Sequence, residues 1–310
     1  MSTTDCRLAI VIPAYKSTYL EDTLFSLSLQ TCKNFHLYIG DDHSPYPIKN
    51  IVDKFTNKLD IQYFRFEENL GGKDLVAQWE RCIKLTSEPW IWLFSDDDYV
   101  DSNCVQSFYE FQKKHQDIDL FRFNVNIVNN KKIILSSSVF PQKSSSDFLF
   151  RNKAKGGLNC FAVEFIFSRN IYTQNGGFQK FDLAWGTDTA TWMKFGLNGI
   201  GTIPDAYVYW RSSGENITTQ NNSDFLIRKL KASNSFLLWA KKFYDTYIGN
   251  CDTFIDYIFI KRIVSTSDLI PLKKCISISN DFLGNGLRRI ILICFIHLYH
   301  FLIKLRKFFS

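Results

Sequence analysis

Three consecutive aspartates, Asp96, Asp97 and Asp98, follow the apolar run WIWLF that begins at Trp90. Adjacent carboxylates at the end of an apolar strand repel one another unless a cation or strong hydrogen-bond donors compensate for their charge. Carboxylate oxygens suit Mg²⁺ or Mn²⁺, and Mg²⁺ is typically held by one or two carboxylates together with substrate phosphates. The triplet therefore predicts a divalent-metal site, and the alternative is an acidic turn that caps the following helix.

Polar residues also follow the three earlier apolar runs, at the point where each run ends. In an open α/β sheet, ligands bind beyond the carboxyl ends of the strands, near the position where the strand order reverses. We therefore expect these residues to converge with the aspartate triplet on one edge of a sheet. They are Pro13-Ala14-Tyr15 after LAIVI, Asp41-Asp42 at the end of FHLYIG, and Glu67-Glu68-Asn69 after IQYFRF.

The elements that would position these residues alternate between apolar runs and helical patterns, which is typical of β/α units and a mainly parallel sheet. Leu20, Leu24 and Leu27 give one apolar helix face, and Thr18 with Glu21 has the spacing of a capping box. Further expected elements are a helix opening at Gly71-Gly72, strands near residues 120–125, 132–135, 160–167 and 206–210, a mobile Ser- and Lys-rich loop over residues 142–157, and a helix after Gly186.

The charge of the chain is divided unevenly along its length. The net charge is +6, but residues 226–310 hold 14 Lys/Arg and 5 Asp, which leaves −3 for residues 1–225. A catalytic body with a basic, membrane-contacting tail fits this pattern, whereas a nucleic-acid binder with a basic polar face does not. Eight cysteines without a CxxC pair, and an N-terminus without a signal-peptide pattern, favour reduced thiols and a cytoplasmic location.

Taken together, these segments resemble the inverting glycosyltransferases of family two, which have the nucleotide-sugar-binding GT-A fold. The resemblance runs from about Leu8 to about Trp210 and is carried by VIPAYKSTYLEDTLFSLSLQT, IGDDHS, ENLGGKD and FSDDDYVD in that order. It implies an α/β, Rossmann-like GT-A catalytic domain over residues 1–225, with a mainly parallel central sheet flanked by helices. Residues 226–310 are expected to form a helical, basic C-terminal extension.

The resemblance also assigns the donor site. Pro13, Ala14 and Tyr15 match the loop that packs around the nucleotide base, and Tyr15 has core packing as its alternative. Asp42 matches the residue that accepts a hydrogen bond from a uracil-type base, while Asp41 is an alternative brace for the loop. Lys73 falls where the family places a cation near the base or the phosphates, with an exposed first-turn residue as the alternative.

In the family, the acidic run is usually Asp-x-Asp-Asp, and Ser95 stands at its first position here. With the match anchored on Tyr99, the resemblance makes Asp97 the direct metal ligand with Asp98 in support, and places Asp96 near the ribose. The alternative is that Asp96 and Asp98 form the working pair.

An inverting transfer needs a base that takes the proton from the acceptor hydroxyl. Asp188, in FDLAWGTDTATWMKFG, matches the carboxylate that the family places at the start of a helix on the acceptor side. Its alternative is a helix N-terminal residue favoured by the dipole, and Asp182 is the second candidate base. Arg211 is predicted to contact the diphosphate from a loop closing over the site, with a surface salt bridge as the alternative.

Residues 290–303 form a nearly unbroken apolar run with basic residues on both sides. Fourteen residues fall short of the about 20 that span a bilayer. We therefore expect a helix over about residues 288–309 that lies in the membrane interface, on the inner face of the cell membrane, with its basic flanks on anionic headgroups. The alternative is a helix docked against the body of the protein.

The leading hypothesis is metal-dependent transfer, with inversion, of a hexose-type sugar from a nucleoside-diphosphate sugar, with UDP favoured over dTDP and GDP. The expected acceptor is a glycan or a lipid-linked acceptor in bacterial surface polysaccharide synthesis. The alternative is a non-catalytic nucleotide-sugar-binding module on the same fold. A dinucleotide-binding oxidoreductase is disfavoured, because no GxGxxG follows the first strand.

Overall fold

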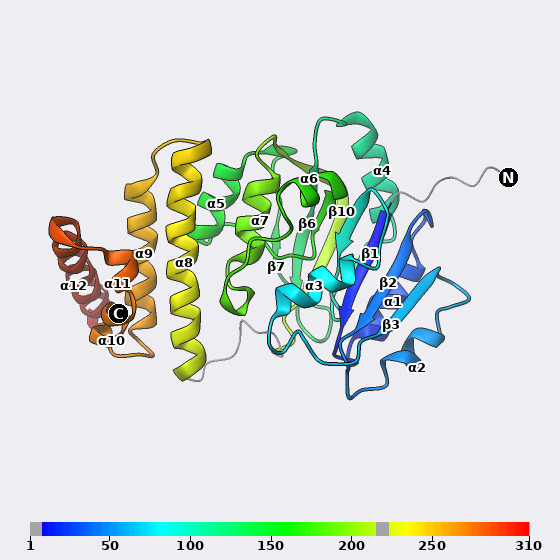
Figure 1. Cartoon of the computed structure of the whole chain (residues 1–310), viewed down its shortest axis with the longest axis horizontal. Helices are drawn as coiled ribbons and strands as arrows, with labels where there is room; N and C mark the ends of the chain where they lie inside the picture. Colours follow the sequence, from blue (N-terminus) through cyan, green and yellow to red (C-terminus); the bar gives the residue numbers. More distant parts are fainter. Residues whose placement is uncertain (1–7, 215–222, 310) are drawn as a thin grey trace. The chain divides into compact units, whose positions relative to one another are not determined.

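The computed structural model describes residues 8–214 and 223–309. The chain divides into two compact units, both drawn in Figure 1. The sheet unit comprises Met1–Gln179 and Thr191–Glu215, and the helical unit comprises Lys180–Ala190 and Asn216–Ser310. The predicted boundary after residue 225 puts residues 180–190 with the sheet, whereas in the structure they cluster with the C-terminal helices.

One sheet forms the centre of the sheet unit (Figure 1). Its strands are β1 (Leu8–Ala14), β2 (His36–Asp41), β3 (Ile61–Arg65), β4 (Trp90–Leu93), β5 (Tyr99–Val100), β6 (Leu120–Val128), β7 (Ile134–Ser138), β8 (Lys143–Ser144), β9 (Phe165–Ser168) and β10 (Ile200–Arg211). Their order is β3-β2-β1-β4-β9-β6-β10-β5, with β7 beside β6 and β8 beside β10. β3, β2, β1 and β4 pair in parallel, and β6 and β10 run in the same direction because β9 is antiparallel to both β4 and β6. The predicted α/β fold with a mainly parallel sheet is confirmed.

Helices cover both faces of the central strand β1, which is why its sequence is a continuous apolar run. The helices that begin in the sheet unit are α1 (Leu20–Ser28), α2 (Ile48–Asp53), α3 (Leu75–Ile83), α4 (Cys104–Lys114), α5 (Ser146–Lys155) and α6 (Arg169–Gln174), while α7 (Thr187–Phe195) begins in the helical unit. Leu8, Ile10 and Ile12 share one core with buried residues of α1, α2 and α4. On the other face, a Cβ at Gly40 would lie 2.4 Å from Cys82 Sγ of α3, so the glycine lets this helix approach β2 closely.

The prediction of a mobile loop over residues 142–157 is wrong, because this segment contains β8 and α5. The Ser145 hydroxyl accepts a hydrogen bond from a first-turn N–H group of α5 at 3.1 Å. Gly156 ends the helix with a left-handed φ of 76°, as glycine commonly does. Leu149 and Phe150 are buried and anchor the helix despite the polar composition around them.

Two predicted helix starts are also wrong. Thr18 and Glu21 form no capping box, because no side chain caps α1 and the Glu21 carboxylate pairs with Lys54 at 2.8 Å instead. α3 does not open at Gly71-Gly72 but after Asp74, whose side chain accepts a hydrogen bond from the third residue of the helix at 2.9 Å. Aspartate at this position satisfies a backbone donor that the helix itself leaves unpaired.

A buried ion pair joins β6 to the segment before β9. The Arg122 guanidinium donates to Glu164, and the two residues are 1 % and 0 % exposed. The guanidinium also lies 3.2 Å from the ring centroid of Phe140 and 4.8 Å from that of Phe165. Burial raises the pKa of Glu164 to about 7, although Arg122 opposes the rise. Arg122 therefore favours the charged form of the Glu164 carboxylate against the effect of burial.

An Arg122→Met variant should lose about 3–5 kcal/mol of unfolding free energy at pH 8, because it leaves the Glu164 charge buried without a partner. The loss should shrink at pH 5.5. In the folded protein the pKa of Glu164 is raised from its ordinary value of 4.5 to about 7. The folded state therefore binds this proton more tightly than the unfolded state does. As a result, the free energy of unfolding falls as the pH rises from about 4.5 through 7. Urea unfolding at both pH values measures the effect. Equal losses at the two pH values would contradict it, and Arg122→Met with Glu164→Gln should recover most of the loss.

The helical unit packs its C-terminal helices on one another and on the segment 180–190. The elements are the 3₁₀ helix η1 (Asp182–Ala184), α8 (Ser223–Tyr247), α9 (Asp252–Thr266), α10 (Leu272–Ile278), α11 (Asn280–Leu283) and α12 (Gly286–Phe309). η1 contacts α8, and α9 contacts both α8 and α12. Arg228 of α8 forms a bidentate pair with Asp182 at 2.6 and 2.9 Å. A Cβ at Gly186, whose φ is +89°, would lie 3.0 Å from the Phe236 ring.

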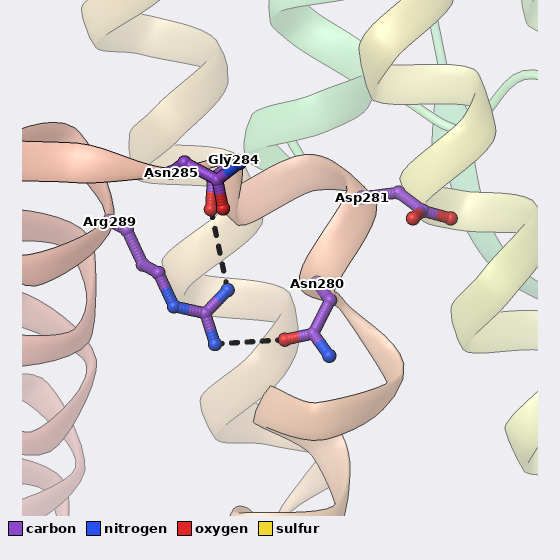
Figure 2. A pocket seen from close by; sticks show the side chains of 5 residues that line it. All are labelled: Asn280, Asp281, Gly284, Asn285 and Arg289. Carbon is purple, nitrogen blue, oxygen red and sulfur yellow. Dashed lines mark hydrogen bonds between the residues drawn. The ribbon is translucent and has the colours of Figure 1, made fainter.

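A polar hollow lies between α11 and the first turn of α12 (Figure 2). Arg289 reaches across it and donates to Asn280 Oδ1 at 2.9 Å and to the Gly284 carbonyl at 3.3 Å. Asp281 and Asn285 complete the lining. Both of these hydrogen bonds go to protein oxygens, so Arg289 fixes the turn that precedes α12.

α12 is longer than its apolar run predicts. The helix has 24 residues. By length and composition, its segment Gly286–Arg306 is long and apolar enough to cross a membrane, and little of its most apolar part (11 %) is buried in the protein. The helix is thus longer than the 14-residue apolar run on which the prediction of an interfacial helix rests. Leu292 and Ile296 are buried, and α12 packs on α9.

Candidate functional site

The loops that follow β1 and β4 are tied together by the side chain of Asp96. β1 and β4 are parallel neighbours, with Val11 opposite Leu93, so the chain leaves both strands at the same edge of the sheet. There Asp96 Oδ2 accepts hydrogen bonds from the backbone N–H groups of Tyr15 at 2.8 Å and Lys16 at 2.7 Å. The predicted convergence of these two loops is confirmed.

Asp98 is engaged on both carboxylate oxygens. Oδ2 accepts a hydrogen bond from the Ser95 hydroxyl at 2.5 Å, and Oδ1 accepts one from the backbone N–H of Arg211 at 2.7 Å. Its carbonyl oxygen accepts a hydrogen bond from the Thr23 hydroxyl at 2.7 Å. A metal ion that contacts the Asp98 carboxylate must share or replace one of these donors. Ser95, where the sequence departs from the family pattern, thus supports the turn.

Among the described residues, the Asp97 carboxylate accepts fewer hydrogen bonds than the carboxylates of Asp96 and Asp98. Its side chain is 10 % exposed, and the ammonium of Lys16 lies 2.9 Å from Oδ2. Among residues 8–214 and 223–309, Lys16 is the only hydrogen-bond partner of this carboxylate. The contacts therefore favour Asp97 over Asp96 and Asp98 as the direct metal ligand.

Burial and the neighbouring charge raise the pKa values of two members of the triplet, Asp96 and Asp98. Burial, followed by the neighbouring Asp97 charge, raises the pKa of Asp96 to about 6, and the same two causes raise the pKa of Asp98 well above its usual range. A bound divalent cation inverts this tendency. The donors are carboxylate oxygens, which Mg²⁺ and Mn²⁺ prefer, so the residues fit such an ion.

The described residues do not hold a ready-made metal cage, since no three Asp, Glu, His or Cys side chains in that part of the chain are grouped to bind an ion. Mg²⁺ is ordinarily bound by one or two carboxylates together with substrate phosphates rather than by an all-protein cage. The geometry at Asp97 matches this arrangement.

Asp42, predicted to contact a uracil-type base, holds the loop that follows β3. Its carboxylate oxygens accept hydrogen bonds from the backbone N–H groups of Leu70 and Gly71, both at 2.8 Å. The side chains of Asn69 and Arg81 donate to the same carboxylate. A nucleotide base must share these oxygens with the loop, and the base-binding role of Asp42 stays a prediction.

Asp41 braces the β2 end, as its alternative interpretation predicts. The fully buried carboxylate accepts hydrogen bonds from the Ser44 N–H at 2.8 Å, from Arg65 at 2.8 Å and from the Tyr63 hydroxyl. Burial, together with the Asp41 carboxylate, raises the pKa of Tyr63 to about 12. The tyrosine therefore remains a hydrogen-bond donor over the physiological pH range.

The other predicted nucleotide contacts differ in their exposure. Tyr15 is 40 % exposed and Pro13 is half-buried, whereas the methyl group of Ala14 is fully buried in the core. The whole residue is 0 % exposed, so Ala14 presents no exposed atom to a nucleotide in this structure. Lys73 is 73 % exposed at its side chain and lies 3.4 Å from Glu68. The roles of these four residues in nucleotide binding stay predictions.

The prediction that Arg211 lies in a closing loop is wrong, because β10 extends to Arg211 and the residue is fully buried. Its Nε donates to the carbonyl oxygen of Asp97 at 2.8 Å, and its Nη2 donates to Asp22 at 3.0 Å. The guanidinium lies 4.1 Å from the ring centroid of Tyr19. Arg211 thus holds the backbone of the aspartate turn from within the core. Its contact with a diphosphate stays a prediction.

Asp188 lies in the helical unit, at the start of α7, as predicted. Its Oδ1 accepts hydrogen bonds from the backbone N–H of Thr189 at 2.7 Å and from the Thr189 hydroxyl at 3.3 Å. The second candidate base, Asp182, is committed to Arg228, whose hydrogen bonds lower the pKa of Asp182. Of these two carboxylates, Asp188 is therefore the better candidate for a proton acceptor.

Sequence reasoning missed three residues that the structure places at this site: Lys16, Asp22 and Arg81. Lys16 pairs with Asp97, Asp22 pairs with Arg211, and Arg81 pairs with Asp42. Lys16 adjoins the predicted base loop and Arg81 lies on the predicted helix after Gly72, but their partners are 81 and 39 residues away. Only the position of Lys16 beside Tyr15 is a local signal.

Comparisons with known proteins agree with this geometry. A family model described as glycosyl transferase family 2 matches residues 9–175. The poly(ribitol-phosphate) β-N-acetylglucosaminyltransferase TarS of Staphylococcus aureus is 22 % identical over 214 residues, which cover 67 % of this chain and 36 % of TarS. The chain thus spans about a third of the length of this relative.

Two solved structures share the fold. The crystal structure of residues 1–349 of S. aureus TarS in complex with UDP-GlcNAc has a TM-score of 0.59 at 17 % identity, covering 88 % of this chain and 83 % of that one. The mannosyltransferase PcManGT from Pyrobaculum calidifontis, in complex with GDP-Man and Mn²⁺, has a TM-score of 0.52 at 13 % identity, covering 96 % and 81 %.

The sheet, the aspartate turn and the β1 loop define a GT-A fold, as the sequence resemblance implies. Because the family model matches more than half of the chain, the protein belongs to glycosyl transferase family 2.

Proposed function

We propose that the protein transfers a sugar from a nucleoside-diphosphate sugar, with a UDP-sugar favoured, to a glycan or lipid-linked acceptor. The observation that carries the proposal is the joining of the aspartate turn to the Tyr15-Lys16 loop through Asp96, at the carboxyl edge of a family 2 sheet. TarS, whose structure contains UDP-GlcNAc and whose name describes transfer to poly(ribitol-phosphate), supports a UDP donor and an acceptor in bacterial surface polymer synthesis.

In this proposal the transfer depends on Mg²⁺ or Mn²⁺, which Asp97 holds with Asp98 in support, while Asp96 lies near the ribose. The ion, when bound, neutralises charge on the diphosphate leaving group. The chain's own residues fix the geometry: Asp96 holds the loop at Tyr15 by two backbone hydrogen bonds, and Arg211 holds the main chain of Asp97. Mn²⁺ in the PcManGT structure supports the choice of metal.

Asp188 is proposed to accept the proton of the acceptor hydroxyl. The hydroxyl oxygen forms its bond to the anomeric carbon while the bond to the diphosphate breaks on the opposite side, so the configuration at that carbon inverts. The proton passes to the Asp188 carboxylate.

A non-catalytic nucleotide-sugar-binding module is the second candidate function. It is favoured by one observation, namely that the Asp188 carboxylate already accepts two hydrogen bonds from Thr189, as an ordinary helix-start residue does. Release of UDP from UDP-sugars, with and without Mn²⁺ and a membrane fraction as acceptor source, separates the two. The transferase releases UDP only with acceptor and metal, and the binding module releases none.

We also propose that α12 lies in the membrane interface on the inner face of the cell membrane. Its exposed apolar side chains fall within about 140° of one another at the ~100° per residue of an α-helix, and the buried Leu292 and Ile296 point to the opposite side. Lys304 and Arg306 are exposed near its C-terminal end. An apolar stripe with basic ends is the pattern of an in-plane helix on anionic lipid. The stripe consists of Leu287, Ile290, Ile291, Phe295, Leu298, Phe301, Leu302 and Leu305.

Wild-type protein should therefore co-sediment with vesicles that contain anionic phospholipid and should bind neutral vesicles less. A Phe295→Ser, Phe301→Ser variant should lose most of this binding, because each replaced side chain removes roughly 2–3 kcal/mol of apolar burial. The circular dichroism spectrum should be unchanged, since both side chains are exposed. Unaltered vesicle binding by the folded variant would instead favour docking of α12 on protein.

A further inference from the structure

The ammonium of Lys16 lies beside Asp97, the proposed metal ligand. Its ammonium lies 2.9 Å from Asp97 Oδ2, and its backbone N–H donates to Asp96 Oδ2 at 2.7 Å. The Lys16 side chain is 29 % exposed and that of Asp97 is 10 % exposed, so the pair lies at the rim of a buried turn. One residue thus contacts two of the three carboxylates.

We propose that Lys16 is a resident counter-cation of the aspartate triplet, which the divalent ion displaces from Asp97 when the nucleotide sugar binds. The inference rests on the proposed metal site at Asp97. Three adjacent carboxylates repel one another, and a single ammonium offsets only part of their charge. Lysine carries a compact charge on a flexible four-carbon stem, so the ammonium can leave Asp97 while the backbone hydrogen bond to Asp96 stays in place.

The diphosphate of the donor supplies the displaced ammonium with a new partner. Its negative oxygens come to the same edge of the sheet as the metal, so Lys16 exchanges a carboxylate for a phosphate rather than for water. Metal and nucleotide should therefore strengthen each other's binding, because the nucleotide removes the competitor of the metal. By linkage, the metal strengthens nucleotide binding by the same factor.

The Lys16→Met variant should bind Mn²⁺ alone more tightly than the wild type, by about 5- to 150-fold, the usual range of coupling between two sites. It should also gain less Mn²⁺ affinity than the wild type when UDP is added. A merely structural role of Lys16 gives the opposite result, because a disturbed turn binds the ion more weakly. Lys16→Arg keeps a cation beside Asp97 and should retain weak binding of Mn²⁺ alone.

The experiment titrates MnCl₂ into the full-length protein by calorimetry, with and without UDP. Lys54→Met is the matched control, because it removes an exposed ammonium that pairs with Glu21 outside the triplet, and it should behave as the wild type. Mn²⁺ affinity of Lys16→Met equal to or below the wild-type value overturns the proposal, and Lys16→Gln serves if the methionine variant does not fold. A wild type that binds no Mn²⁺ even with UDP overturns the metal site itself.

Discussion

An Asp97→Asn variant is expected to transfer sugar about 10³-fold more slowly than the wild type while keeping its fold. Loss of the metal contact removes about 4 kcal/mol of transition-state stabilisation, and each 1.4 kcal/mol corresponds to about tenfold in rate. The amide has the size of the carboxylate but lacks the charge that holds the ion. The Arg211 side chain donates to the main-chain carbonyl of residue 97, so this hydrogen bond does not use the side chain of residue 97 and should persist.

The rate of UDP release with Mn²⁺ and an acceptor-containing membrane fraction measures this effect, and thermal unfolding in EDTA checks the fold. Asp53→Asn is a matched control, since Asp53 is an exposed aspartate of α2 that pairs with Lys49. It should retain the full rate. Full activity of Asp97→Asn would reject Asp97 as the metal ligand and would favour Asp96 with Asp98 as the working pair.

An Asp188→Asn variant is expected to lower kcat by about 10²- to 10⁴-fold, the range over which a positioned general base acts. Its affinity for the donor should be unchanged, because in this account the base contacts the acceptor hydroxyl and not the nucleotide. The asparagine side-chain oxygen can still accept the Thr189 hydrogen bonds that the structure shows, so the start of α7 should remain intact.

Steady-state rates at saturating donor, together with calorimetric donor binding, separate the two effects of this substitution. Asp182→Asn is the discriminating comparison, because the Asp182 carboxylate is already paired with Arg228 and should contribute little to proton transfer. If Asp188→Asn transfers sugar as fast as the wild type, Asp188 is only a helix-start residue and the base lies elsewhere.

The strands and the convergence of their ends could be predicted from the sequence because both depend on local patterns. Continuous apolar runs such as LAIVI and WIWLF mark strands that are buried on both faces, and the parallel order of β1 and β4 then brings Tyr15 and Asp96 to the same edge. Helix α5 could not be predicted, because its sequence lacks such a local apolar pattern. Only Leu149 and Phe150 among its ten residues are large buried apolar side chains, so its periodicity is weak.

The partners of the site residues could not be predicted, because they lie far away in the sequence. Arg211 donates to the carbonyl oxygen of Asp97, which is 114 residues away in the sequence. The carboxylate of Asp42 accepts a hydrogen bond from the Leu70 N–H group instead of facing solvent. A sequence pattern gives the identity of a carboxylate but not which of its oxygens is already used. The match to the family pattern already favours Asp97, and the hydrogen bonds of Asp96 and Asp98 supply a second, independent reason.

The most direct test of the account is calorimetric titration of the full-length protein with UDP-, GDP- and dTDP-sugars, each in the presence of Mn²⁺ and in EDTA. We predict that a UDP-sugar binds with Mn²⁺, that binding weakens strongly in EDTA, and that Asp97→Asn abolishes this metal dependence. Absence of binding by every donor in a folded sample, or equal binding with and without metal, would contradict it.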